Sequence, residues 1–599
     1  METNKNPSGS GQDMLAIARR LAGLPADKRA IFRQRLRESG IDFSGLPIVP
    51  LSERPASIPL SFAQQRLWFL HQLEPGSAAY NIPTALKLEG RLDNAALESA
   101  FKAVIARHES LRTVFREIDG KAEQLVLPAI DFRLPVIDLS GLPCDEREAE
   151  ALRLARTDAV RPFDLGAGPL MRAALLKLAD TEHILAVTMH HIVSDGWSMN
   201  VLLRELGAHY AGKVADLRPL AIQYADFALW QQEWLTSDVL AAQLDYWKAQ
   251  LGNEHPVLEL PADRPRPLAQ SGRGAKLRFT LSEALTAGLR QYAKEQGATL
   301  FMTTLAAFSV LLHRLSGQND IRIGVPIANR NRIETENVIG FFVNTQVLRA
   351  QPDARMSFVE LLARVKEAAL GAQAHQDLPF EQLVEALQPE RNLSHSPLFQ
   401  AMFNLQTSRL DSDSRMGDMR VQALPQDSGA AQFDLSLDIV ERQGRLEAAL
   451  TYSTDLFEAA TVERFAGYYT NLLDAIVAAP HARIGQLPML GRDEYHQLTS
   501  GWGVAASVSE PFIAVHAQFE AQARTTPDAI ALVYDDAEFT YAELNAQANR
   551  LAHRLIAAGI GADARAGVCI ERSPAMIVAL LAILKAGGAY VPLDPNYPA

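Results

Sequence analysis

A seven-residue string, His-His-Ile-Val-Ser-Asp-Gly at residues 190–196, constrains this sequence more than any other feature. It follows an apolar run, residues 184–189, that is typical of a buried strand, and it precedes residues 197–206, whose apolar spacing predicts a helix. Successive strand side chains point to opposite faces, so His190 and His191 cannot both enter one cleft while the strand is regular. We therefore expect one histidine to reach a substrate and the other to pack or to anchor the turn.

The last two residues of the string, Asp195 and Gly196, suit a turn from strand to helix. A carboxylate before a helix can cap its first N–H groups or pair with a cation. Glycine permits backbone angles and close approaches that other residues resist. A zinc site is disfavoured, because no further histidine or cysteine stands nearby at ligand spacing.

This string resembles the His-His-x-x-x-Asp-Gly core motif of the condensation domains of nonribosomal peptide synthetases. A shorter His-x-x-x-Asp-Gly string also marks acyltransferases that use coenzyme A thioesters, so the string alone indicates acyl transfer without fixing the substrate. Six further segments resemble the family's other signatures in the family's order, and together the resemblance covers roughly residues 57–490. These segments are residues 61–70, 107–115, 224–230, 339–346, 375–380 and 391–400.

The resemblance implies an α/β fold in which two chloramphenicol-acetyltransferase-like lobes form a V-shaped pseudo-dimer, with the active site at their junction. We expect the N-terminal lobe over residues 58–225 and the C-terminal lobe over residues 226–490. Within the second lobe, the apolar pattern predicts a strand at residues 321–326 and a helix at residues 358–370. No sequence repeat relates the lobes, so this architecture rests on the resemblance.

The N-terminal segment differs from the lobes in composition. Residues 1–12 are small and polar, and we expect them to be disordered. Residues 13–57 are expected to form two short amphipathic helices with a basic outer face, followed by a linker. These helices would either cap the next domain or dock a partner protein.

The chain changes character again beyond a predicted linker at residues 491–510. Residues 539–544 and 584–598 resemble the first two signatures of an adenylation domain, which we place at residues 511–599. The family's phosphate loop, nucleotide-binding aspartates and late catalytic lysine do not follow. We therefore expect a truncated adenylation fragment without ATP chemistry, and the rest of that domain would be a partner in a full synthetase.

The composition limits the ligand class and the cellular location that this chain can have. With 599 residues, the chain is too long for a single hydrophobic core. A net charge of −12 and the absence of a basic run interleaved with aromatic residues argue against nucleic-acid binding. The two cysteines, Cys144 and Cys569, offer no disulfide framework and suit a reducing compartment. The polar N-terminus lacks a signal core, and the longest apolar stretch, residues 575–584, is too short to span a bilayer. We expect a soluble, cytoplasmic monomer without a membrane partner.

The resemblance implies a role for each residue of the site. The imidazole of His191, with an ordinary pKa of about 6.5, would accept the proton of the attacking amine or hold the neutral amine. The backbone N–H of Gly196 would approach the thioester and stabilise the developing oxyanion. The remaining site residues are expected to be structural supports: His190, Asp195 paired with Arg330 of the second lobe, and Arg66 in the first signature.

The implied reaction joins a carrier-bound acyl or peptidyl thioester to the amino group of a carrier-bound aminoacyl acceptor. Both substrates would arrive on phosphopantetheine arms of separate donor and acceptor carrier domains, because this sequence has no Gly-Gly-x-Ser attachment pattern. We expect no cofactor bound by the chain itself and no metal.

Three functional hypotheses remain open at this stage. Ser194, Trp197 and Ser198 follow the pattern that we associate with domains joining two L-configured residues. A starter domain, which N-acylates the first amino acid with a fatty acyl group from acyl-coenzyme A, is the alternative, since only a short helical segment precedes the domain. The third hypothesis, a catalytically idle recruitment module, is disfavoured by the intact His191 and Asp195.

Overall fold

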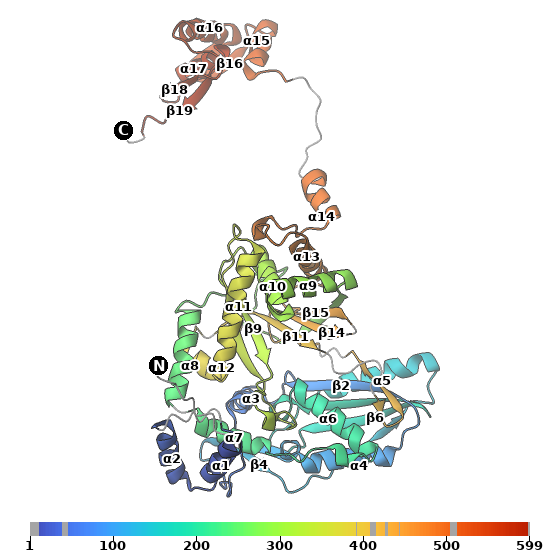
Figure 1. The fold of residues 1–599 in the computed structure, drawn as a ribbon. Helices are drawn as coiled ribbons and strands as arrows, with labels where there is room; N and C mark the ends of the chain where they lie inside the picture. Colours follow the sequence, from blue (N-terminus) through green and yellow to red (C-terminus); the bar gives the residue numbers. More distant parts are fainter. Residues whose placement is uncertain are drawn as a thin grey trace. The chain divides into compact units, whose positions relative to one another are not determined.

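The computed structural model describes residues 11–38, 46–235, 237–390, 392–407, 415–425, 429–442, 444–502 and 512–596. The chain forms two compact units, Met1–Tyr495 and His496–Ala599. Two six-stranded mixed sheets and one three-stranded sheet belong to the first unit, and two small two-stranded sheets belong to the second (Figure 1). The mixed α/β class predicted from the sequence is confirmed.

The first six-stranded sheet has the order β12-β13-β2-β7-β6-β5. Strand β7 covers the predicted strand and pairs antiparallel with both β2 and β6. Leu185, Val187 and Met189 of β7 pack in the same cluster as helices α4 and α6, whereas Ile184 packs with α5 on the opposite face. Burial on both faces explains why this strand reads as an unbroken apolar run. The elements are β2 (Asn81–Glu89), β5 (Val136–Asp138), β6 (Met171–Ala179), β7 (Glu182–His190), β12 (Arg415–Met416), β13 (Met419–Leu424), α4 (Asn94–Arg107), α5 (Cys144–Ala159) and α6 (Gly196–Tyr210).

Strands β12 and β13 depart from a simple division of the chain at residue 225. They come from the range assigned to the C-terminal lobe, yet β13 pairs antiparallel with β2, with Val421 opposite Leu88. Met419 and Val421 are buried in the cluster that fills the first sheet. The local pattern of β13 predicts a strand but carries no information about its partner, because strand pairing is a tertiary choice.

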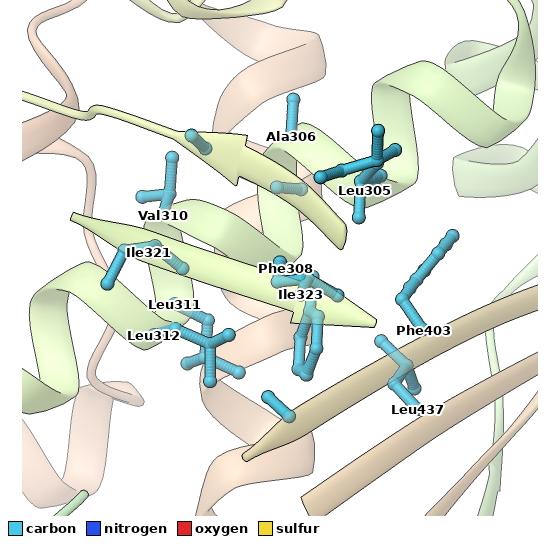
Figure 2. Packing of buried hydrophobic residues seen from close by; sticks show 14 of the residues in the cluster. Leu305, Ala306, Phe308, Val310, Leu311, Leu312, Ile321, Ile323, Phe403 and Leu437 are labelled. Carbon is cyan, nitrogen blue, oxygen red and sulfur yellow. The ribbon is translucent and has the colours of Figure 1, made fainter. Parts of the chain in front are cut away.

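The second six-stranded sheet has the order β10-β9-β11-β14-β15-β8, and helices α9, α10, α11 and α13 pack in its core. Figure 2 shows Phe308 and Leu312 of α10 close to Ile323 of β9, with Phe403 of β11 nearby. The predicted strand and helix of this lobe are confirmed as β9 and α11. The elements are β8 (Gly274–Thr280), β9 (Ile321–Ile327), β10 (Asn344–Ala350), β11 (Ala401–Thr407), β14 (Leu435–Arg442), β15 (Arg445–Ser453), α9 (Glu283–Glu295), α10 (Leu300–Ser316), α11 (Phe358–Ala374) and α13 (Ala459–Ala478).

The smaller elements of the first unit surround these sheets. A three-stranded sheet has the order β1-β4-β3, and helices α3 and α12 contact each other. The elements are β1 (Ile58–Pro59), β3 (Thr113–Ile118), β4 (Lys121–Val126), α3 (Phe62–Leu73), α7 (Tyr224–Trp234), α8 (Ser237–Leu251) and α12 (Phe380–Leu387).

Two N-terminal helices, α1 (Gly11–Ala22) and α2 (Ala26–Glu38), pack on α7. Arg29 and Arg33 of α2 form ion pairs of 2.7 and 2.8 Å with Glu233 of α7. The pair of helices predicted here is confirmed, and it caps the next domain. The predicted basic outer face is wrong for Arg29 and Arg33, because their side chains face α7 and are only 12 % and 14 % exposed. Residues 1–10 of the segment expected to be disordered lie outside the described residues, whereas α1 begins at Gly11.

The predicted linker at residues 491–510 is helical in its described part, with α14 (Arg492–His496) followed by a turn at Gln497–Gly501, and residues 503–511 lie outside the described residues. In the described residues no single helix is long and apolar enough to cross a membrane, although the bent pair α9 and α10 passes such a test by length and composition.

The second unit contains α15 (Val515–Thr525), β16 (Ile530–Tyr534), β17 (Ala537–Thr540), α16 (Tyr541–Ala557), β18 (Arg565–Val568), α17 (Pro574–Lys585) and β19 (Ala589–Pro592).

Candidate active site

The two histidines differ in which ring nitrogen carries the proton. His190, the last residue of β7, accepts a hydrogen bond from the Ile192 N–H at its Nδ1 over 3.1 Å, so its neutral ring is protonated at Nε2. His191 begins a short helical turn, and its Nδ1 lies 2.9 Å from the Ser194 carbonyl oxygen. Because a carbonyl oxygen only accepts, the neutral His191 is protonated at Nδ1 and has a lone pair at Nε2. Only His191 therefore offers Nε2 as a proton acceptor.

The structure gives a different reason for the separate roles of His190 and His191 than the strand alternation assumed from the sequence. Strand alternation does not apply to His191, because β7 ends at His190. The rings have different surroundings instead: His190 packs edge-on against Phe163 at 6.1 Å, and His191 lies 5.0 Å from the ring of Phe341. Phe341 belongs to the loop between β9 and β10, so His191 is placed beside a residue of the second half of the chain.

Burial keeps both rings neutral. Desolvation lowers the pKa of His190 to about 3. It also lowers the pKa of His191, an effect that the negative charge of Asp195 and the Ser194 carbonyl partly oppose. At neutral pH His191 is therefore uncharged and able to accept a proton.

The low pKa of His190 predicts a pH-dependent stability. The pKa of a histidine in the unfolded chain is about 6.5. Between that value and about 3, the unfolded chain binds a proton that the folded chain refuses, so the free energy of unfolding falls as the pH decreases. We expect His190→Asn to show a shallower fall than the wild type in urea unfolding at pH 7 and pH 5. The same substitution at the exposed His481 is the control, and equal slopes for the wild type and His190→Asn would contradict this assignment.

Asp195 is fully buried and uses both carboxylate oxygens in hydrogen bonds. It caps α6 by accepting the Ser198 N–H at 2.7 Å, and it accepts the Phe342 N–H at 3.1 Å. The Nη2 of Arg330 lies 3.1 and 3.2 Å from its two oxygens. The ion pair implied by the resemblance is therefore present, and it joins the first turn of α6 to the β9–β10 loop.

Arg330 organises this loop as well as pairing with Asp195. Its Nη1 donates to the carbonyl oxygen of Val338 at 2.7 Å, and its Nη2 donates to the Ser198 hydroxyl at 2.8 Å. The guanidinium carbon lies 4.0 Å from the ring centroid of Phe342. Because the side chain is 1 % exposed, these partners replace water at its two terminal nitrogens, whereas its buried Nε has no hydrogen-bond partner among the described residues.

The loop lies against the first lobe at further points. The Ser110 hydroxyl donates to the Ile339 carbonyl oxygen at 2.6 Å, and the Tyr224 hydroxyl donates to that of Phe341 at 2.6 Å. A Cβ added to Gly340 would lie 2.0 Å from the ring of Tyr224. Only glycine fits at this position, and it lets the loop bring Phe341 against His191.

We expect Gly340→Ala to lower the free energy of unfolding by about 1–3 kcal/mol, because the added methyl group overlaps a fully buried tyrosine ring. Urea unfolding measures this loss. Gly196→Ala is the matched control, since a Cβ at Gly196 meets no described atom within 4 Å. Equal stabilities for the two variants would contradict the close packing at Gly340.

Gly196 begins α6 next to open space. Its φ lies outside the left-handed region, so the backbone angle does not require glycine here.

Arg66 of α3 lies next to helix α12. Its Nη1 is 3.6 Å from Glu381, and its guanidinium carbon lies 5.5 Å from the ring centroid of Phe380. The positive charge of Arg66 also contributes to lowering the pKa of His191.

Several residues of the site were missed by the sequence analysis. Most lie inside segments that it had already singled out as signatures, but their partners depend on the tertiary fold. Among the described residues, no three His, Cys, Asp or Glu side chains converge to hold a metal. The missed residues are Ser110, Tyr224, Gly340, Phe341, Phe342 and Glu381.

Comparison with protein families agrees with this site. The model of the condensation domain matches residues 55–499, about three quarters of the chain. The chain belongs to the condensation domain family. Residues 519–599 match the model of AMP-binding enzymes. The condensation match includes the histidine pair, Asp195 and Arg330.

Related proteins are parts of nonribosomal peptide synthetases. One of the linear gramicidin synthase subunits of Brevibacillus parabrevis is 49% identical over 558 residues, which are 92% of this chain and 7% of that protein. Phosphinothricin tripeptide synthetase PhsC of Streptomyces viridochromogenes is 42% identical over 97% of this chain and 54% of its own length. This condensation domain chain thus spans only 7–11% of the three gramicidin synthase subunits that it matches.

Solved structures show the same fold. The X-domain from teicoplanin biosynthesis, in complex with OxyB, has a TM-score of 0.67 and 31% identity over 74% of this chain and 98% of its own. A four-domain holo nonribosomal peptide synthetase bound to AMP and glycine has a TM-score of 0.68 and 28% identity over 91% of this chain and 42% of its own. The expected chloramphenicol-acetyltransferase-like fold, followed by an adenylation fragment, is confirmed.

Proposed function

We propose that this chain forms an amide bond between two thioester-tethered substrates, as the condensation domain of a nonribosomal peptide synthetase. The observation that carries the proposal is the tautomer of His191, whose Nδ1–H donates to the Ser194 carbonyl and leaves Nε2 free to accept a proton. The condensation-domain match and the synthetase relatives support the same class of reaction.

The chemistry assigned to His191 follows from the protonation states of the attacking amine and of the imidazole. An α-amino group has a pKa near 8 and is mostly protonated at neutral pH, so it must lose a proton before it attacks. The neutral Nε2 of His191 accepts that proton or holds the neutral amine by a hydrogen bond. The amine nitrogen then bonds to the thioester carbon and gives up one proton, the carbon–sulfur bond breaks, and the sulfur takes up that proton and leaves as a thiol.

Gly196 and Asp195 take different parts in this proposal. The Gly196 N–H is at the start of α6, where backbone N–H groups and the helix dipole favour a developing negative charge on the thioester oxygen. Asp195 takes no proton, because Arg330 and two backbone N–H groups occupy its oxygens. The remaining site residues are therefore proposed to position the site, and they are His190, Asp195, Arg330 and Arg66.

We expect Gly196→Ala to fold like the wild type but to condense more slowly, by about tenfold or more. The reason is that its methyl group would enter the open space where the thioester must approach. Circular dichroism and a condensation assay measure the two effects. Wild-type turnover by this variant would contradict the proposed role of Gly196 in the site.

We propose that both donor and acceptor carry L-configured residues on phosphopantetheine arms of separate carrier domains. The motif residues Ser194, Trp197 and Ser198 support this subtype. Ser198 also has a structural part, because its hydroxyl binds Arg330 and the Gly340 N–H. The alternative is a starter domain that uses acyl-coenzyme A to N-acylate the first amino acid.

A competition assay tests the subtype. The same aminoacyl carrier acceptor is offered an L-aminoacyl carrier donor or a fatty acyl-coenzyme A, and product is quantified by mass spectrometry. Dipeptide as the main product supports the proposal, and acylated amino acid as the main product replaces it with the starter type. Absence of both products would favour an idle recruitment module.

We further propose that the 599 residues work as a cytoplasmic monomer and supply no adenylation chemistry of their own. The two cysteines, Cys144 and Cys569, are exposed and unpaired, as in proteins of a reducing compartment. The AMP-binding match covers residues 519–599, in which no phosphate loop occurs. The proposed partners are donor and acceptor carrier domains and the remainder of an adenylation domain.

A further inference from the structure

Side chains of the first lobe hold four successive residues of the β9–β10 loop, residues 339–342, by hydrogen bonds to the loop backbone. One of these contacts involves a histidine outside the catalytic motif. The N–H of Ile339 donates to the Nδ1 of His108 over 3.3 Å. His108 directly follows α4 and is 0 % exposed, so its ring supports the loop and is closed to a substrate.

The contact with Ile339 fixes the position of the proton on the His108 ring. Because Nδ1 accepts a hydrogen bond, the neutral ring carries its proton on Nε2. That nitrogen lies 2.8 Å from a carboxylate oxygen of Glu205 in α6, and the Nε of Arg107 lies 3.1 Å from the same oxygen. Glu205 therefore orients the ring so that the lone pair of Nδ1 faces the loop.

Burial and charge favour this arrangement. Desolvation lowers the pKa of His108, so its ring is neutral at pH 7. Burial by itself would raise the pKa of Glu205, but the hydrogen bond from His108 and the positive charge of Arg107 lower it. A carboxylate on one side and a backbone N–H on the other are both satisfied by the tautomer that carries its proton on Nε2.

The loop backbone connects His108 to the catalytic histidine. Ile339 precedes Phe341 by two residues, a span of at most about 7 Å. The Phe341 ring lies 5.0 Å from that of His191, and Gly340 packs against Tyr224 with no room for a side chain. Loss of the Ile339 contact would free the segment that carries Phe341. A displacement of about 1 Å near reacting groups can cost about 10²-fold in rate.

We propose that His108 is a positioning residue for amide formation. Oriented by Glu205, it holds the N–H of Ile339 and so keeps Phe341 against His191. The inference rests on the proposed function, because amide formation is the reaction that this loop serves. The two ring nitrogens have separate tasks: Nε2 ties α4 to α6, and Nδ1 ties α4 to the loop. A purely structural His108 needs only the first tie.

Two substitutions separate these tasks. The amide oxygen of His108→Asn lies near the position of Nδ1 and keeps an acceptor for Ile339. The amide nitrogen of His108→Gln lies near the position of Nε2 and keeps the donor to Glu205 but leaves Ile339 without an acceptor. We expect His108→Asn to keep kcat within about threefold of the wild type and His108→Gln to lower kcat by about tenfold or more with little change in KM.

Hydrogen–deuterium exchange of the 599-residue protein gives a measurement that needs no turnover. On peptides covering residues 336–343, exchange should be about tenfold faster or more in His108→Gln and close to wild type in His108→Asn. His313→Gln is the matched control and should leave both exchange and kcat unchanged. His313 is a buried histidine of α10 whose Nδ1 lies 2.8 Å from the Gln318 carbonyl oxygen, in the second lobe.

Each outcome decides the inference. Equal losses of kcat in the two His108 variants, or a loss in His108→Gln without faster exchange of the loop, would overturn it. If neither variant folds, Glu205→Gln takes their place, because its amide no longer selects the Nε2 tautomer. It should speed exchange of the same peptides, and wild-type exchange and kcat in this variant would contradict the inference. A wild type that forms no amide refutes the proposed function, and exchange alone then decides whether His108 holds the loop.

Discussion

Replacement of Asp195 by alanine is expected to lower the free energy of unfolding by about 3–5 kcal/mol, or to yield insoluble protein. The substitution leaves the Arg330 guanidinium buried without a counter-charge and leaves the N–H groups of Ser198 and Phe342 without an acceptor. The total stability of a folded domain is about 5–15 kcal/mol, so such a loss is a large fraction of it. Urea unfolding and thermal melting measure the effect.

Arg330→Ala should cost a similar amount, because it strands the Asp195 carboxylate and the carbonyl oxygen of Val338. The double variant should lose less than the sum of the two single losses, since neither charge is then unpaired. Asp195→Asn keeps the shape of the side chain and should retain part of the activity. If the alanine variants are insoluble, Asp195→Asn and Arg330→Lys give a measurable cycle. Additive losses in that cycle would contradict a coupled pair.

Replacement of His191 by alanine is expected to reduce condensation by about 10²–10⁴-fold while leaving the fold intact. The lost group is the free Nε2. Among the described residues the side chain also gives up its hydrogen bond to the Ser194 carbonyl and its ring contact with Phe341. Product formation with carrier-bound substrates measures the rate, and circular dichroism checks the fold.

His190→Ala is the matched comparison, and we expect it to lose stability more than chemistry. Its ring is 5 % exposed, packs on Phe163 and accepts the Ile192 N–H, so its removal leaves a cavity and an unpaired donor. A folded but inactive His190→Ala together with an active His191→Ala would exchange the two roles.

The sequence predicted those parts of the site that depend on local pattern. The apolar run before the histidines and the helical spacing after Gly196 correspond to β7 and α6. Apolar periodicity also predicted β9, α11 and the two N-terminal helices. Each of these elements is determined by residues close in the chain, which a pattern can register.

The remaining features depend on contacts between distant residues. The proton position on His191 is set by the Ser194 carbonyl, which a sequence cannot orient. The fit of Gly340 against Tyr224, and the contact of Arg66 with Glu381, join segments more than one hundred residues apart. The pairing of Asp195 with Arg330 was reached only through family resemblance, because nothing local connects the two positions.

The strand that the second half of the chain gives to the first sheet has a consequence for engineering synthetases by recombination. A chimera joined at residue 225 would place β13 of one parent against β2 of the other, with Val421 facing a foreign counterpart of Leu88. Arg330 on its β9–β10 loop would likewise have to pair with an Asp195 from the other parent. Breakpoints at the edge of the condensation unit, near Tyr495, leave both pairings within a single parent.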